Sequence, residues 1–545
     1  MHAQQFRPHD RFVLWQLYIA LAAVFLGVIM GFFQALERMN IDLFKVFGFA
    51  SYYQGLTLHG VLNVLVFTTA FIGAFLTYVT MRSLGRPMAS YRLTALQFVL
   101  MMLGVVLAGW KMLDNSSTVL FTFYPPLQAH PLFYVGLVFV VLSSWVTFLN
   151  IALTVRAWQR DHPGETVPLQ AFLSLVVYLM WFIASLGVAS EVLVLLIPWS
   201  LGWVERTDPQ LARTLFWFTG HAIVYFWLLP AYISWYTMLP KQVGSKLLSD
   251  PLTRLVFLMF LLFSVPVGFH HQFVDPGVPV MWKTIHAALT YAVFFPSMIT
   301  FFSVIASLEM AGRARGGQGL FGWILKLPWN DPSVTAQLLA GIGFMFGGIS
   351  GLINASYNLN QVVHNTSFVP GHFHLTVGTG VFLSYLGISY WLIPALTGRK
   401  LWQPRLGVVS SWLWLIGVSI FSRGQIAGGL EGMPRRTWMA AATYVLDAWR
   451  IPNMMTAVGG TLMFLGAMSF FTVLLGTLFL SRERVTVTMP VADIITPPEA
   501  ASPIFTRQLG LWVAVLVVLI MITYGPYMIS YFSNPAFVAR GLRVW

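Results

Sequence analysis

Residues 131–155, PLFYVGLVFVVLSSWVTFLNIALTV, form a long run without a single charged side chain. About 20 apolar residues, each rising roughly 1.5 Å, are enough for a helix to cross the hydrocarbon core of a bilayer. Inside lipid the backbone must satisfy its own hydrogen bonds, and a continuous apolar run of this length does so as an α-helix. The stretch therefore predicts a transmembrane helix and argues against a barrel.

The rest of the chain repeats this pattern. Of 545 residues, 57% are hydrophobic and 9% are charged, which excludes an ordinary soluble domain. The predicted spans, separated by charged or Pro/Gly-rich breaks, are 12–36, 51–80, 91–112, 131–155, 168–197, 211–238, 252–274, 280–310, 334–354, 366–396, 404–430, 453–480 and 508–532. We therefore expect an all-α membrane protein, a bundle of about thirteen transmembrane helices in which 1–545 is a single domain.

Lys and Arg in the connecting segments predict the orientation. They are more frequent on one side of the predicted bundle, which the positive-inside rule places in the cytoplasm. The N-terminus is then inside, the C-terminus outside, and the polar stretch 481–507 is a cytoplasmic linker before the last helix. The first apolar run is too long for a signal peptide, so we expect that helix to remain in the membrane.

Charge and cysteine content exclude several functions. The net charge of +13 is scattered over many loops, which fits topology and anionic lipid headgroups better than nucleic-acid binding. The chain has no cysteine, so it cannot form disulfides, thiolate metal sites or iron–sulfur clusters by itself. Any such centre must lie on a partner.

Histidine is the residue type that indicates function. Six of the twelve histidines lie at a similar depth, in the outer half of the predicted bundle, on four different spans; they are His59, His221, His270, His271, His372 and His374. Neutral imidazoles gathered without carboxylates favour transition metals or haem iron. A single membrane histidine, such as His286, is more often a hydrogen bond between helices.

The spacing of the last two histidines predicts two separate centres. His372 and His374 are two residues apart, about 200° around a helix, so they point to nearly opposite faces and cannot share one metal. One of them would pair with His59 on a six-coordinate haem, and the other would be the only protein ligand of a second haem.

The three remaining imidazoles, His221, His270 and His271, suit a mononuclear copper ion. Tyr225 follows His221 by four residues and therefore shares its helix face. A phenol beside the copper ligand could give both a proton and an electron.

Four motifs carry a family resemblance: "TLHGVLN" at 57–63, "GHAIVYFWLLPAY" at 220–232, "GFHHQF" at 268–273 and "HNTSFVPGHFHL" at 364–375. Together they resemble subunit I of the haem-copper oxidases, and the chain is similar to the B-family, ba3-type cytochrome c oxidases over essentially all spans. Any one motif alone would be weak evidence.

The resemblance implies specific cofactor ligands. His59 and His374 would hold a low-spin haem of b type, and His372 a high-spin haem of a type. The copper ion would be bound by the three remaining histidines. Tyr225 matches the tyrosine that the family joins covalently to its first copper histidine, here His221.

The resemblance also implies haem propionate contacts near the outer surface. Arg435 and Arg436, in "MPRRTW" at 433–438, match the arginines that the family pairs with propionates, and His364 and Asn360 belong to the same region. Without the resemblance, two arginines in an outside loop would be interpreted as a solvated pair.

A proton route from the inside surface to the tyrosine is a further implication. The matching hydroxyl positions are Ser249, Tyr236, Tyr232, Ser297, Thr300 and Ser303. The alternative is interhelical hydrogen bonding by unrelated hydroxyls.

Two positions depart from the family pattern. Ala222 replaces the usual proline after the first copper histidine, which we expect to relax the backbone without removing a ligand. Asn360 replaces an aspartate near a propionate, and an amide cannot hold a transferable carboxylate proton. Either His364 takes on more of that role or proton pumping differs.

The predicted function is catalysis by a terminal respiratory oxidase, in which dioxygen is reduced to water with electrogenic proton uptake and proton pumping. The implied partners are a subunit II with a dinuclear copper centre, a small single-helix subunit, and cytochrome c, or alternatively quinol, as electron donor. Two other functions stay open: nitric oxide reduction within the same superfamily, and a metal-free multipass transporter with a histidine proton relay.

Overall fold

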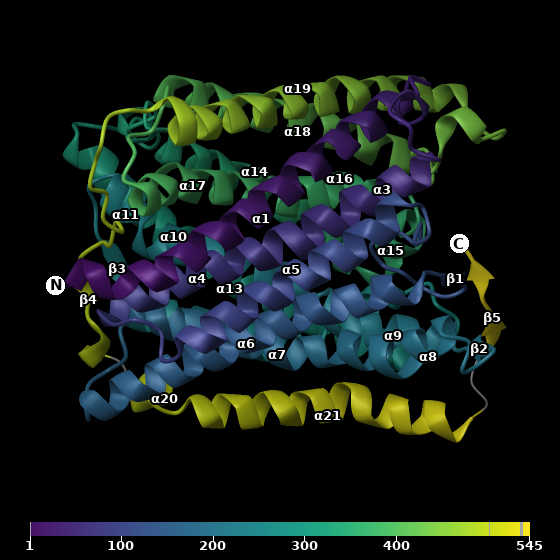
Figure 1. The fold of residues 1–545 in the computed structure, drawn as a ribbon, viewed down its shortest axis with the longest axis horizontal. Helices are drawn as coiled ribbons and strands as arrows, with labels where there is room; N and C mark the ends of the chain where they lie inside the picture. The colour runs from purple at the N-terminus through teal and green to yellow at the C-terminus, as the bar shows by residue number, and fades with distance from the viewer. Residues whose placement is uncertain (1, 501, 535–537, 545) are drawn as a thin grey trace.

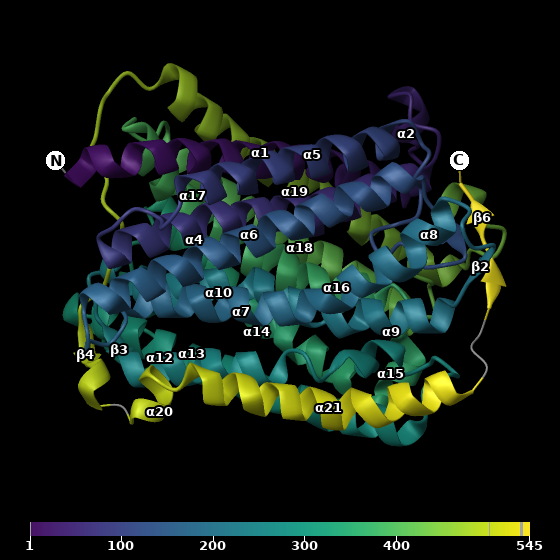
Figure 2. The same cartoon turned by 60° about the horizontal axis from the view of Figure 1, so that its bottom comes forward.

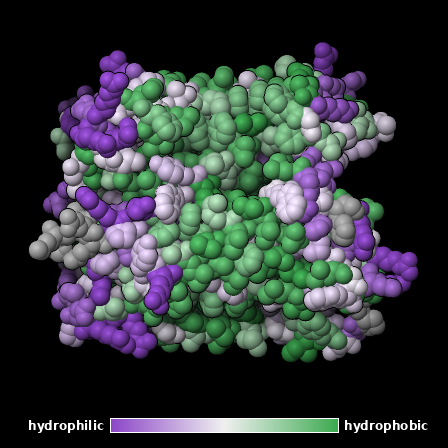
Figure 3. All heavy atoms as spheres, in the orientation of Figure 1, coloured by the Kyte–Doolittle hydropathy of each residue, from purple (hydrophilic) through white to green (hydrophobic). Residues whose placement is uncertain are grey.

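The long helices of the chain run side by side and form one bundle, with apolar surface in a broad belt between two polar ends (Figures 1 and 3). The computed structural model describes residues 2–500, 502–534 and 538–544. Within these residues, twelve helices are long and apolar enough to cross a membrane. The prediction of an all-α membrane protein is confirmed.

The α-helices share the apolar composition expected of membrane spans, apart from several short ones at the bundle ends. Their bounds are α1 His2–Glu37, α2 Leu43–Val46, α3 Tyr52–Val61, α4 Thr68–Leu84, α5 Tyr91–Leu113, α6 Pro131–Asp161, α7 Leu169–Ser190, α8 Ile197–Ser200, α9 Pro209–Gly220, α10 Ala222–Thr237, α11 Leu239–Gln242, α12 Asp250–Phe263, α13 Val280–Ala314, α14 Pro332–Ala355, α15 Tyr357–Val363, α16 Phe368–Leu375, α17 Phe382–Thr397, α18 Pro404–Leu430, α19 Arg450–Leu475, α20 Pro503–Thr506 and α21 Leu509–Ser533.

Several spans are built from successive helical pieces. The π-helical turns η1 Leu62–Phe67, η2 Glu191–Leu196, η5 Thr376–Val381 and η8 Gly476–Leu480 continue α3, α7, α16 and α19. Short 3₁₀ helices are η3 Gly268–Gln272, η4 Ile324–Lys326, η6 Met439–Ala441, η7 Asp447–Trp449 and η9 Pro498–Ala500. A π-helical turn adds a residue to the helix repeat and is frequent at functional sites.

Polar residues at the helix starts explain several of these bounds. The side chains of Ser51, Ser90 and Asp331 accept hydrogen bonds from backbone N–H groups of α3, α5 and α14. These N–H groups have no partner within the helix, so the cap stabilises each start. At the other end, Gly85 and Gly398 adopt the left-handed conformation that stops α4 and α17.

The predicted span 252–274 is not a continuous helix, and this part of the prediction is wrong. Helix α12 ends at Phe263, and the chain then passes through an irregular segment into the 3₁₀ helix η3. Pro266 lies in this segment; it has no N–H to donate to the helix ladder and disfavours helical backbone in the residue before it. The two termini nevertheless lie at opposite ends of the bundle (Figures 1 and 2), as an odd number of passes requires.

Short strands tie loops together at both ends of the bundle. At the end that holds the N-terminus, β3 Leu247–Ser249 pairs in parallel with β4 Ile494–Thr496, so the polar stretch 481–507 packs against the bundle. At the other end, β1 Leu127–Gln128 pairs in parallel with β6 Leu542–Arg543, and β2 Arg206–Thr207 pairs antiparallel with β5 Ala539–Arg540. The C-terminal residues thereby cover the loops before α6 and α9.

Candidate active site

A cavity of about 750 Å³ lies inside the bundle and is lined by all six histidines predicted as ligands, as well as Tyr225. Pockets that hold cofactors have volumes of a few hundred to about 1,000 Å³ and mostly apolar walls. Phenylalanine, valine and glycine residues make up much of this wall. The sequence elements that carry the histidines therefore meet at one buried space.

His59 of α3 and His374 of α16 face each other across part of this cavity. Their rings are nearly parallel, at an interplanar angle of 9°, with centroids 6.3 Å apart. The Nδ1 atoms donate to carbonyl oxygens, that of His59 to Gly27 at 2.8 Å and that of His374 to Pro370 at 2.7 Å. Since a carbonyl can only accept, both Nε2 atoms keep a lone pair for a metal.

His372, which is also on α16, is held in the same way, but by groups of another helix. Its Nδ1 lies 2.9 Å from Oγ of Ser350 and 3.2 Å from the carbonyl oxygen of Gly347, both on α14. The Ser350 hydroxyl donates to Gly347 at 2.7 Å, so its oxygen accepts from His372. The Nε2 atom of His372 is again the free ligand atom, and its partners differ from those of His374.

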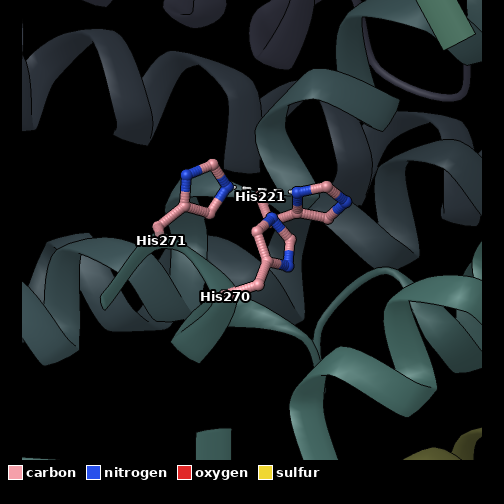
Figure 4. Close-up of side chains that lie close together, drawn as sticks. All are labelled: His221, His270 and His271. Carbon is pink, nitrogen blue, oxygen red and sulfur yellow. Dashed lines mark hydrogen bonds between the residues drawn. The ribbon is translucent and has the colours of Figure 1, made fainter. Parts of the chain in front are cut away.

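His221, His270 and His271 converge at one point (Figure 4). One ring nitrogen from each lies within 4.8 Å of the others, and Nδ1 of His221 is 3.2 Å from Nε2 of His271. Nδ1 of His270 lies 2.8 Å from the hydroxyl of Thr290, which donates at 2.6 Å to the carbonyl of His286. His270 therefore turns Nε2 toward the other two rings, and three imidazoles suit copper.

Irregular backbone positions these three rings. His221 stands between α9 and α10. His270 and His271 lie on the 3₁₀ helix η3, whereas the sequence had predicted a continuous membrane helix there. Consecutive residues on an α-helix diverge by about 100°. The neighbouring rings of His270 and His271 nevertheless both present a nitrogen to the common point. His271 also stacks on Trp217, with centroids 3.8 Å apart.

The Tyr225 hydroxyl lies 3.1 Å from Nε2 of His221, one turn along α10. The same imidazole thus offers Nδ1 to the histidine cluster and Nε2 to the phenol. This arrangement places the phenol predicted to give a proton and an electron directly beside the predicted copper ligand.

Two glycines leave room for the imidazole rings themselves. A Cβ atom on Gly31 would lie 2.7 Å from His59, and one on Gly351 would lie 3.2 Å from His372. Both distances are shorter than an ordinary carbon contact, so larger side chains would displace the imidazoles. Free Nε2 atoms and glycine-lined apolar walls together fit haem.

Comparison with known proteins agrees with this geometry. Residues 11–462 match the family described as cytochrome c and quinol oxidase polypeptide I. The chain belongs to this family. It is 45% identical to cytochrome c oxidase subunit 1 of Thermus thermophilus, over 99% of this chain and 97% of that protein. A Corynebacterium diphtheriae subunit 1 is 28% identical over 78% of this chain and 75% of its own.

A solved structure supports the same assignment. A cryo-EM structure of a heme-copper terminal oxidase dimer matches with a TM-score of 0.92 and 37% identity, covering 98% of this chain and 95% of that one. The predictions of a haem-copper oxidase subunit I fold and of an enzyme of this type are confirmed. Membership implies haems, copper and at least one partner subunit for this oxidase subunit.

The predicted propionate residues line the cavity at the end farther from the N-terminus. Arg435 and Arg436 lie in the loop after α18, and Arg436 has a φ of 65°, an uncommon conformation outside glycine. Burial, with a further contribution from Arg436, lowers the pKa of Arg435 to about 10. His364 lies 2.7 Å by Nδ1 from Oδ1 of Asn360, and burial together with the Arg435 charge lowers the pKa of His364 to about 4.

Hydrogen bonds between α10 and α13 join four of the residues predicted for the proton route. Tyr232 donates to Ser297 at 3.2 Å, and Tyr236 donates to Thr300 at 3.1 Å. Ser303 lies one turn beyond Thr300 and is buried. Ser249 is not joined to this ladder by any hydrogen bond among the described residues; its hydroxyl accepts from Leu252 at 3.3 Å and caps α12.

Three other features were missed or left open by the sequence. Ser350 and Thr290 orient histidines but resemble the many membrane hydroxyls that bond their own helix, so no sequence signal distinguishes them. His286 accepts from the Phe269 N–H at 3.2 Å and lies 3.2 Å from the Thr523 carbonyl, the interhelical role expected of a single histidine. Helix α9 passes into α10 at His221, whose backbone stays in the helical region with φ −85° and ψ −42°.

Proposed function

We propose that this chain is the catalytic subunit of a cytochrome c oxidase that reduces dioxygen to water. The observation that carries the proposal is the convergence of His221, His270 and His271 within 4.8 Å, with the Tyr225 hydroxyl in hydrogen-bond reach. His372 lines the same cavity and supplies a ligand for a second metal. A proton relay without metals would not need three imidazoles around one point.

The residues divide between two haems and one copper ion. His59 and His374 hold the low-spin haem, of b type, and His372 holds the high-spin haem, of a type. The copper ion is held by His221 and the two histidines of η3. When bound, the haems transfer electrons and the high-spin haem and copper together supply the reducing centre for oxygen.

The protein groups control protons and geometry around that centre. Backbone carbonyls and the hydroxyls of Ser350 and Thr290 keep the imidazoles in one tautomer and orientation, which raises their basicity as ligands. Tyr225 gives its phenolic proton and an electron at the oxygen site, from its place within hydrogen-bond reach of His221. Protons reach it from the cytoplasmic side.

The proton route runs between α10 and α13. Tyr232 and Tyr236 with Ser297, Thr300 and Ser303 form its inner wall, and Ser249 stands near its entrance. Proton uptake from one side makes turnover electrogenic. Pumped protons leave toward the outside through the propionate region. His364 carries them there because the Asn360 amide cannot.

Partners complete the electron path. A cysteine-free chain cannot hold a thiolate-bridged copper pair, so a subunit II carries the dinuclear copper that receives electrons from cytochrome c, with quinol as the alternative donor. A small single-helix subunit is a further partner. The complex lies in a prokaryotic plasma membrane, with the N-terminus and the 481–507 linker in the cytoplasm.

A metal assay on the purified complex tests the proposal. We expect one copper in this subunit for every two haems, a visible spectrum with low-spin and high-spin bands, and oxygen uptake driven by reduced cytochrome c. Copper-free protein with additional non-haem iron would indicate nitric oxide reduction instead. A colourless protein would indicate the metal-free transporter. Oxygen uptake driven only by quinol would show that quinol, and not cytochrome c, is the electron donor.

A further inference from the structure

Four arginine side chains line the central cavity, and no aspartate or glutamate does so in the described part of the chain; they are Arg38, Arg213, Arg435 and Arg436. A buried guanidinium without a counter-ion is costly, so such groups normally pair with carboxylates. The wall of this cavity therefore requires anions.

Arg213 already has its counter-ion within the protein. Its guanidinium binds Asp275 through two parallel hydrogen bonds, Nε to Oδ2 at 2.8 Å and Nη2 to Oδ1 at 2.9 Å. Among the described residues, Arg38, Arg435 and Arg436 have no carboxylate within 4.0 Å. Arg435 and Arg436 belong to the propionate region, which leaves Arg38 without an assigned role.

Arg38 directly follows the last residue of α1 and is only 8% exposed. Its Nη1 atom is fully buried and has no hydrogen-bond partner. Tyr52, at the start of α3, lines the same cavity, and its hydroxyl interacts electrostatically with the Arg38 guanidinium. An arginine that is nine-tenths buried, lines a cavity and keeps an unused donor is placed to bind an acidic group within that cavity.

The position of Arg38 along α1 indicates which haem this is. Gly27 and Gly31 contact the His59 ring, and Arg38 lies seven residues beyond Gly31, two helical turns on the same face and about 10 Å along the axis. Glu37 accepts from the Ala440 N–H at 2.8 Å, which anchors this end of α1 to the chain just after Arg435 and Arg436. Arg38 thus lies on the low-spin side of the arginine cluster.

We propose that Arg38, with the Tyr52 hydroxyl beside it, binds a propionate carboxylate of the low-spin haem. The inference rests on the proposed ligation of that haem by His59 and His374. A cation at this place favours the reduced haem, because the oxidised form carries one more positive charge. Arg38 is therefore a positioning and potential-setting residue and not a catalytic one.

Equilibrium redox titration of the purified complex tests the role, with each haem followed by its own absorbance band. We expect Arg38→Met to move the midpoint potential of the low-spin haem to a more negative value and to leave that of the high-spin haem unchanged. Arg38→Lys keeps the positive charge, so its low-spin midpoint potential should lie close to that of the wild-type complex. Tyr52→Phe should give a smaller shift in the same direction.

Arg450→Met is the matched control, since Arg450 is an exposed arginine at the start of α19, outside the cavity. It should leave both potentials unchanged. If Arg38→Met does not assemble, Arg38→Gln takes its place in the same comparison. Unchanged low-spin potentials, or equal shifts in both haems, would overturn the inference. A wild-type complex that lacks a low-spin haem band would instead overturn the proposed function.

Discussion

Each of four predicted ligand histidines has one ring nitrogen already occupied by a protein group. His59, His372, His374 and His270 all direct Nδ1 to a carbonyl or hydroxyl oxygen, and all keep Nε2 for the cavity. A ring whose tautomer and rotation are set in advance loses less freedom when it binds a metal. The oxygens that orient the imidazoles are therefore as much a part of the site as the ligands.

Thr290 gives the sharpest test of this point. Thr290→Val keeps the shape of the side chain but removes the oxygen that accepts from His270, so we expect copper affinity to fall by roughly 10- to 100-fold. Copper content after dialysis against graded chelator measures the change, and Thr290→Ser, which keeps the hydroxyl, is the control. Equal copper retention in all three proteins would show that His270 needs no such support.

Tyr225 is the residue on which the proposed chemistry depends most directly. Tyr225→Phe removes the phenolic proton, so oxygen uptake should fall by roughly 100-fold or more, while haem and copper contents stay the same because the phenol is not a metal ligand. Tyr291→Phe is the matched control, since this exposed α13 phenol bonds only the Leu352 carbonyl at 3.3 Å. Full activity in Tyr225→Phe would contradict the assigned role.

At the scale of the element, departures from regular α-helix occur next to the ligands. A π-helical turn follows His59 at η1, and another follows His374 at η5. A 3₁₀ turn carries His270 and His271, and the backbone changes helix at His221. A continuous α-helix presents one residue in three or four to a given face, so these breaks re-aim side chains that an unbroken helix would turn away.

Helix α1 contributes to the site by having no side chain at one position. In Gly31→Ala the new methyl group would meet the His59 ring at 2.7 Å, an overpacking that costs about 1–3 kcal/mol. We expect partial loss of the low-spin haem, measured from the haem difference spectrum. Gly109→Ala on α5 meets nothing within 4 Å and should retain both haems. A full content of low-spin haem in Gly31→Ala would show that α1 and the His59 ring are not tightly packed at this position.

At the scale of the whole molecule, the arrangement of polar and apolar surface defines how the bundle sits in lipid. Twelve membrane helices together with the interrupted α12–η3 segment connect termini that lie at opposite ends (Figure 2). The active-site cavity lies inside the bundle, so oxygen, protons and electrons must all reach it through the protein. Orientation then determines from which side each of them arrives.

The cysteine-free chain allows a direct test of that orientation. Gln318 lies in the exposed loop between α13 and α14, and Glu205 lies in the exposed loop between α8 and α9. In intact cells, a membrane-impermeant maleimide should label Glu205→Cys and leave Gln318→Cys unlabelled until the cells are opened. The opposite labelling pattern would reverse the proposed topology and the direction of proton uptake.

Sequence alone predicted the positions of nearly all membrane helices, because hydropathy along the chain reflects the solvent that each segment meets. It also predicted that the six histidines meet in one region and that Tyr225 lies beside His221, since i and i+4 residues share a face whatever the tertiary structure. The span 252–274 was wrong because a single proline-containing segment ended the helix early, and average hydropathy does not register such a break.

Only the tertiary structure decided which groups touch across helices. The role of Ser350 depends on how α14 packs on α16, and that of Arg38 on where α1 ends beside α3. Neither residue differs in type or spacing from others that point elsewhere. Periodicity describes one helix at a time, whereas a binding site is set by distances between helices, and those distances follow from the packing of the complete bundle.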